Sequence, residues 1–113
     1  ERVKEEGIEL LLGDQPKLFI AQLGEQAKLL GLKIMKDLRD ADIPFAESID
    51  RDGMQPQLRM ADRLKVQWTI IIGQKEVLDQ TVILRNMESG MQEVIDRDKL
   101  VKELERRLNI VRQ

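Results

Sequence analysis

The chain has 113 residues, of which 42% are hydrophobic and 35% are charged, so its apolar material suffices for one compact domain and not for two. The formal net charge of -2 excludes a bulk electrostatic grip on nucleic acid and leaves local, specific contacts for any RNA partner. The absence of cysteine and histidine excludes disulfides, thiol nucleophiles, imidazole bases and the usual zinc sites.

The sequence gives no support for a membrane-spanning protein or for a secreted one. No apolar run reaches the roughly 18 residues that a membrane span needs. No signal peptide is visible either. We therefore expect no membrane partner and a cytoplasmic location.

The first 15 residues form a segment of a different kind. Residues 1–6 are typical of the charged end of a helix, which Gly7 would stop. A small natural protein seldom starts in the middle of a helix, so we expect this sequence to be cut from a longer chain. We predict that residues 1–15 are the end of a preceding domain's helix and a linker, and that residues 16–113 are the domain itself.

Strands and helices alternate in the next part of the chain. An apolar run over residues 17–22 predicts a buried strand, which Gly24 ends. The apolar spacing that follows predicts a helix over residues 25–41. A second strand is expected over residues 43–49 and a short helix over residues 55–64. The inner face of the first helix would consist of Ala27, Leu30, Ile34, Leu38 and Ala41.

The remaining part begins with the strongest strand signal in the chain, residues 67–72. That run is β-branched and apolar without alternation, which is typical of a central strand buried on both faces. Residues 81–85 and 91–95 predict a hairpin. Asp96 can cap a last helix. The inward-facing residues of that helix would be Leu100, Val101, Leu104, Leu108 and Val111.

These elements predict an α/β fold. The first three strands are joined through helices, so they should be parallel with right-handed crossovers. The fourth should run antiparallel, because only a short segment separates it from the third. We therefore expect a three-layer α/β/α sandwich with a mixed five-stranded sheet.

Residues that could perform chemistry are few. Gly24 lies where an anion could meet a helix N-terminus, but a single glycine fits a tight turn better. Residues 50–52 (Asp-Arg-Asp) lack the further ligands of a calcium loop and are typical of a solvated turn. Trp68 opens an apolar strand, so we assign it to the core or its edge and not to base stacking. We expect no catalytic residue and no metal site.

Open α/β sheets usually place ligands at the carboxyl edge of their strands. The polar groups expected at that edge are Gln22, Glu25, residues 47–50 and residues 73–76.

A family resemblance adds to these inferences. Residues 57–64 (Gln-Leu-Arg-Met-Ala-Asp-Arg-Leu) and 68–76 (Trp-Thr-Ile-Ile-Ile-Gly-Gln-Lys-Glu) resemble the Q-x-K-x-A-D-K-L-G-A … I-I-G-x-x-E block of class IIa anticodon-binding domains. Residues 81–93, which include Arg-Asn-Met-Glu-Ser-Gly-Met-Gln, are most similar to the histidyl-tRNA synthetase family. Residues 7–10 resemble that family's link from the catalytic domain to the anticodon-binding domain. The likeness extends from Gly7 to about residue 108.

The chain departs from the family pattern in three places. Residues 53–56 are Gly-Met-Gln-Pro where the family usually has Ser-Leu-Lys-Lys or similar, so two common basic positions are neutral here. The usual Gly-Ala after Leu64 is Lys-Val. The usual glycine before Thr81 is Gln80.

The resemblance implies which residues read the anticodon. In class IIa relatives the bases are read around the glutamate of the I-I-G-x-x-E block and a basic residue at the end of the fourth strand, which match Glu76 and Arg85. Lys75, Gln74 and Asn86 are the implied neighbours. A carboxylate accepts from base amino or imino groups, and a guanidinium can grip guanine with two hydrogen bonds. The histidine anticodon, GUG, holds two guanines.

The implied function is anticodon binding within a histidyl-tRNA synthetase, which joins histidine to its tRNA using ATP with magnesium. This piece would supply tRNA recognition only, would need no cofactor of its own, and would contact neither DNA nor membrane. The parent is expected to be a homodimer, and residues 1–6 would end its catalytic domain.

Two alternatives stay open. One is a synthetase-like paralogue domain used for protein–protein contact or regulation, which the neutral residues Gln55 and Pro56 and the -2 charge keep in view. The other is a small enzyme with a flavodoxin-like sheet. The loop at residues 23–26 is poor in the Gly, Ser and Thr that a phosphate-binding loop needs, which disfavours it.

Overall fold

The computed structural model describes residues 16–47 and 53–108. The predicted helix end and linker (residues 1–15), the polar turn at residues 50–52 and the inward-facing Val111 lie outside the described residues.

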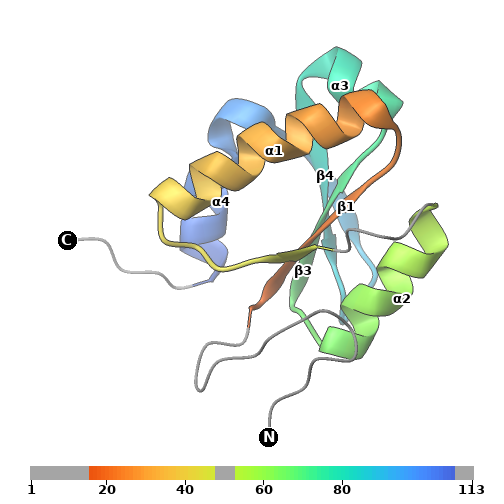
Figure 1. Cartoon of the computed structure of the whole chain (residues 1–113). Coiled ribbons are helices and arrows are strands. Elements are labelled where there is room, and N and C mark those ends of the chain that lie inside the picture. Colours follow the sequence, from red (N-terminus) through yellow and green to blue (C-terminus); the bar gives the residue numbers. More distant parts are fainter. Residues whose placement is uncertain (1–15, 48–52, 109–113) are drawn as a thin grey trace, which may run out of the picture.

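The chain builds one sheet with helices on both faces (Figure 1). In order, the elements are β1 (Leu18–Gln22), α1 (Glu25–Asp40), β2 (Ala46–Glu47), α2 (Met54–Leu64), β3 (Trp68–Ile72), α3 (Gln74–Asp79), β4 (Thr81–Asn86), β5 (Gln92–Asp96) and α4 (Leu100–Arg107).

The five strands lie in the order β2-β1-β3-β4-β5. β1 pairs in parallel with β2 and β3, and β4 pairs antiparallel with β3 and β5. The prediction of a mixed five-stranded sheet, parallel in its first three strands and antiparallel at the fourth, is therefore confirmed.

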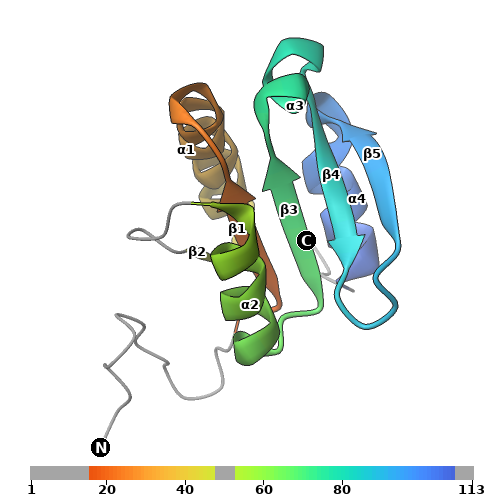
Figure 2. The ribbon, with the colours of Figure 1, turned by 90° about the vertical axis from the view of Figure 1, so that its right-hand side faces the viewer.

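The core has two parts, one on each face of the sheet. On one face α1 and α4 cover residues that alternate along the strands, such as Leu18, Ile70 and Leu84. On the other face α2 covers Phe19 and Ile71. Figure 2 shows that α2 lies over β1, whereas β4 and β5 have no helix on that side.

The predicted inner faces of the two long helices are confirmed. Ala27, Leu30, Ile34, Leu38 and Ala41 are buried at α1, and at α4 Leu100 and Leu104 are buried while Val101 and Leu108 pack partly buried against the core. Trp68 is half-buried and packs against the same core, as predicted for a residue at the core edge.

Three features of the structure differ from the prediction. The short helix α3 was not predicted, because six residues carry too little apolar periodicity to signal a helix. β2 begins at Ala46 and not at residue 43: Ile43 is buried before the strand, and Pro44 has no N–H for a ladder. Residues 48 and 49 of the predicted strand lie outside the described residues. A 3₁₀ turn (Arg97–Lys99) precedes α4, and Asp96 stands at its N-cap position without a capping side-chain hydrogen bond.

Candidate nucleic-acid interface

The β4–β5 hairpin exposes one of its faces. Directly paired strand residues share a face, so Arg85 lies beside Gln92, and Ile83 lies beside Val94. Ile83 packs against the core on the α2 side, which places all four side chains on the uncovered face seen in Figure 2. Val94 is 67% exposed. We call these four residues the open face of the hairpin.

Arg85 is the cation of this open face. Its Nη1 donates a hydrogen bond to Oε1 of Gln92 at 3.0 Å. No carboxylate among the described residues lies within ion-pair distance of its guanidinium. Its Nε is buried and has no partner in the described part of the chain, and the same holds for Oγ1 of Thr69, the residue opposite on β3. Arg85 therefore keeps its charge and most of its donors.

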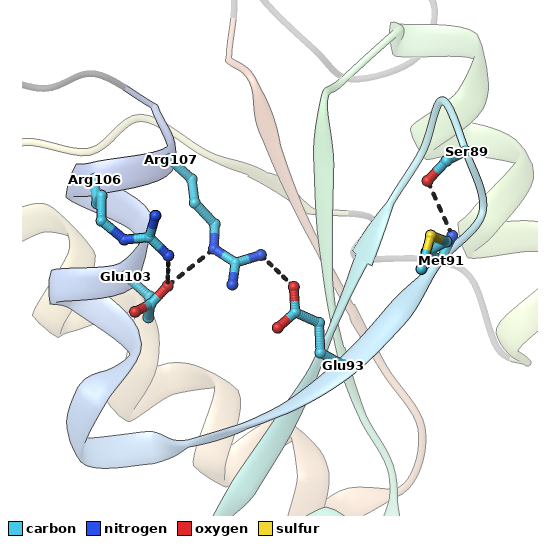
Figure 3. A network of polar contacts seen from close by, with 6 residues as sticks. All are labelled: Ser89, Met91, Glu93, Glu103, Arg106 and Arg107. Carbon is cyan, nitrogen blue, oxygen red and sulfur yellow. Dashed lines mark hydrogen bonds and ion pairs between the residues drawn. The ribbon is translucent and has the colours of Figure 1, made fainter.

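Asn86 builds the turn that follows. Its Oδ1 accepts hydrogen bonds from the backbone N–H groups of Glu88 and Ser89, each at 2.9 Å. Ser89 Oγ in turn accepts from the N–H of Met91 at 3.2 Å, as Figure 3 shows. Side-chain oxygens that bond nearby backbone N–H groups fix a turn. Asn86 thus holds the end of the hairpin next to Arg85.

Glu76 has a different setting. It is the third residue of α3, and its Oε1 accepts a hydrogen bond from the N–H of Gly73 at 2.8 Å, the glutamate half of a capping box. The residue is only 9% exposed. Its carboxylate is thus engaged in starting α3.

The two residues before Glu76, Gln74 and Lys75, are exposed. Lys75 bonds Asp79 one turn along α3 at 2.7 Å, and this hydrogen bond raises the pKa of Lys75 above its ordinary value. Gln74 opens the helix and lies in solvent.

The structure separates the predicted site residues into two groups. Arg85 pairs with Thr69 near the start of β3, while Gln74, Lys75 and Glu76 follow the end of that strand. From Thr69 to Ile72 the strand advances about 10 Å at its usual rise per residue. Arg85 and Asn86 therefore lie together at one end of β3, and the three α3 residues lie at the other.

At the carboxyl edge of β1, polar side chains bond one another. Gln22 donates through Nε2 to Glu47 Oε1 at 3.1 Å. The amide of Gln57 on α2 bonds both the backbone N–H of Gln22, at 2.8 Å, and its carbonyl oxygen, at 2.7 Å. Gln57 is 1% exposed, and its amide bonds the N–H and the carbonyl oxygen of Gln22 as a neighbouring strand would.

Sequence reasoning missed the roles of Gln57 and Gln92, although both stand in the motifs that carry the resemblance. No signal in the sequence identifies the backbone partners of Gln57. For Gln92 a signal exists: paired residues of a hairpin share a face, so its position opposite Arg85 follows once the turn length is known.

The opposite face of the hairpin is closed by α4. Arg107 bonds Glu93 of β5 at 2.6 Å and Glu103 of its own helix at 3.0 Å, as Figure 3 shows. Its guanidinium also lies 5.0 Å from the centre of the Trp68 ring, within cation–π range. Hydrogen bonds from the neighbouring arginines lower the pKa of Glu93 (Arg107) and that of Glu103 (Arg106 first, then Arg107). The bond with Glu93 raises the pKa of Arg107.

Within residues 16–47 and 53–108, no group of three or more His, Cys, Asp or Glu side chains could hold a metal ion. No helix in this part of the chain is long and apolar enough to cross a membrane.

The chain is similar to known proteins in sequence and in fold. The family model of the anticodon binding domain matches residues 17–107. The histidine–tRNA ligase of Thermosipho africanus is 46% identical over 85 residues, which are 75% of this chain and 20% of that protein. The histidine–tRNA ligase of Staphylococcus haemolyticus is 32% identical over 107 residues, 95% of this chain and 25% of that protein. The chain thus spans about a fifth to a quarter of the length of these curated relatives.

Solved structures agree with the sequence relatives. The apo histidyl-tRNA synthetase of S. aureus superposes with a TM-score of 0.73 at 34% identity, covering 88% of this chain and 29% of that one. The histidyl-tRNA synthetase of Nostoc sp. PCC 7120 gives a TM-score of 0.76 at 23% identity, covering 84% and 23%, which is a likeness of fold alone.

Proposed function

Because the chain belongs to the anticodon binding domain family, we propose that the open face of its β4–β5 hairpin binds the anticodon loop of a tRNA. The observation that carries this proposal is the setting of Arg85. Its guanidinium has a neutral partner, Gln92, and no carboxylate among the described residues. A guanidinium in that state can contact a phosphate or grip the acceptor edge of guanine.

The tRNA we propose is that of histidine, because the relatives described above are histidine–tRNA ligases. The longer protein would join histidine to that tRNA, with ATP and magnesium held by its catalytic part, in the cytoplasm and as a homodimer. This domain would supply recognition alone. Aminoacylation of a histidine tRNA by the whole protein, and its absence with the domain alone, would test this division of labour.

For the α3 residues we propose a contribution that depends on Glu76 as a cap. Glu76 fixes the first turn of α3, and that turn presents Gln74 and Lys75 to solvent, where a phosphate or base can reach them. Glu76→Gln keeps an acceptor for the N–H of Gly73 and Glu76→Ala does not. We expect RNA binding to survive the first change better than the second, and equal losses would favour direct base contact by the carboxylate.

The proposal is tested with an RNA hairpin that carries the GUG anticodon. We expect Arg85→Ala to weaken binding by about 1–3 kcal/mol, the usual size of a bidentate base contact. Arg85→Lys keeps the positive charge but loses the planar guanidinium that can donate two parallel hydrogen bonds. We therefore expect an intermediate loss of affinity. Fluorescence anisotropy at several salt concentrations gives both the affinity and the number of charges involved.

Arg106→Ala is the matched control. It removes the same charge from the exposed side of α4, on the other face of the sheet, so RNA affinity should not change. Equal binding of the hairpin by the unchanged chain and by Arg85→Ala would contradict the proposal. Failure of the unchanged chain to bind any tRNA hairpin would instead favour a domain used for protein contact or regulation. Hairpins with glycine, threonine and proline anticodons test the identity of the tRNA.

A further inference from the structure

Gln92 is the residue that meets Arg85 on the open face of the hairpin. It opens β5, its side chain is exposed, and its amide oxygen accepts from Nη1 of Arg85 at 3.0 Å. An exposed hydrogen bond between two long side chains contributes little to folding, because both also bond well to water. The main effect of this hydrogen bond is therefore on the direction in which the guanidinium of Arg85 points.

The atoms of Arg85 are not equally available. Nε is buried, so the side edge of the guanidinium through Nε cannot take a ligand without rearrangement. Nη1 keeps one hydrogen after its bond to Gln92, and Nη2 faces Gly90, where an added Cβ would already lie 3.7 Å away. A larger side chain at position 90 would cover Nη2. The remaining hydrogens of Nη1 and Nη2 are thus the part of the guanidinium that is left for a ligand.

The partner of Arg85 is an amide and not a carboxylate, so it adds no negative charge beside the guanidinium. On the closed face a carboxylate, Glu93, meets Arg107 at 2.6 Å, and the two charges offset one another. A neutral amide orients Arg85 and leaves its positive charge in place.

We propose that Gln92 is a positioning residue for anticodon recognition, which holds Arg85 end-on toward the acceptor edge, O6 and N7, of a guanine base. This inference rests on the proposed function. It adds a residue outside the predicted site and gives a reason for its chemical type, since recognition here needs an acceptor without a charge.

The test is a mutant cycle between Gln92→Met and Arg85→Ala, with binding of the GUG hairpin to the 113-residue chain as the readout. Methionine keeps the length of the side chain and removes the acceptor. We expect Gln92→Met alone to weaken binding about three- to tenfold, the size of one hydrogen bond. In the Arg85→Ala background the same change should have no effect, because Gln92 acts through Arg85. Gln26→Met, on the exposed side of α1, is the matched control.

The preference for guanine over 7-deazaguanine is a second measurement, which a purely structural role of Gln92 would leave unchanged. Hairpins with 7-deazaguanine lack the N7 acceptor at one chosen guanine. We expect this replacement to weaken binding by the unchanged chain at one of the two guanines, to weaken it less with Gln92→Met, and not to affect Arg85→Ala. Gln92→Glu should fold normally and still bind RNA poorly, because its carboxylate would neutralise the fork.

The outcomes separate the two proposals. If the unchanged chain does not bind the hairpin, both fail. If it binds and Arg85→Ala weakens it, while Gln92→Met is neutral or weakens binding equally in both backgrounds, the positioning role alone is overturned. Full binding by Gln92→Glu would also overturn it, since the proposed role requires a neutral partner for Arg85.

Discussion

The two faces of the β4–β5 hairpin hold one arginine each, and the two differ in every neighbour. Arg107 reaches the closed face from α4 and meets two carboxylates and the Trp68 ring. Arg85 stands on the open face with the amide of Gln92. Since Gln92 and Glu93 are adjacent in sequence, the alternation of a single strand decides which arginine is neutralised.

The difference separates a structural cation from one that can bind a ligand. An arginine with bonded carboxylates has little left to offer a phosphate or a base, and its loss should appear in stability. An arginine with a neutral partner adds little to stability, and its loss should appear in binding. The same distinction applies to Glu76, which the resemblance marks as a reader of bases and which the structure places in a helix cap.

We expect the strongest effect from two adjacent residues of β5 that lie on opposite faces of the hairpin. Ile95 is 8% exposed and belongs to the core under α4, whereas Val94 is 67% exposed on the open face. Ile95→Ala should lower the free energy of unfolding by about 2–4 kcal/mol, through lost burial and an unfilled cavity. Val94→Ala should lower it by less than about 1 kcal/mol. Urea denaturation measures both, and similar losses would mean that the open face is covered by another part of the fold.

The next effect compares the two arginines. Arg107→Ala should lower the free energy of unfolding by about 1–2 kcal/mol, because it removes a cation–π contact and the apolar stem of a mostly buried side chain. Arg85→Ala should lower it by less, under about 1 kcal/mol, because the half-buried Arg85 has no carboxylate partner among the described residues. The urea midpoints, with the slopes checked for a common value, provide the measurement. A greater loss with Arg85→Ala would assign Arg85 to the scaffold and weaken its proposed role in binding.

The smallest effect is a dependence on pH. Neighbouring arginines lower the pKa of Glu93 and of Glu103 in the folded chain. A lowered carboxyl pKa contributes stability that is present above the unfolded value, about 4.3, and is lost as the pH falls through the lowered folded value. Between pH 6 and pH 3 the Arg107→Ala variant should therefore lose less stability than the unchanged chain. Arg85→Ala should follow the unchanged chain, and parallel curves for all three would show that the Arg107 contacts do not hold in solution.

The class of fold and most of its elements could be predicted from the amino-acid sequence alone. Apolar spacing located α1, α2, β3 and α4, because a helix or strand that buries one face must repeat its apolar residues with its own period. Connections through helices predicted the parallel strands, since crossovers in such sheets have one hand. The motif residues placed Arg85 at the end of the fourth strand, where the structure has it.

Tertiary structure decided what those residues can do. α3 has six residues and depends on its cap and its packing, so the apolar periodicity of the sequence did not predict it. Gln57 bonds the backbone of Gln22, 35 positions away, which only the packing of α2 against β1 brings about. Alternation along β5 fixes that Gln92 and Glu93 point to opposite faces. The position of α4 decides which face is closed, because the docking of a helix depends on the whole sheet and not on the strand that it covers.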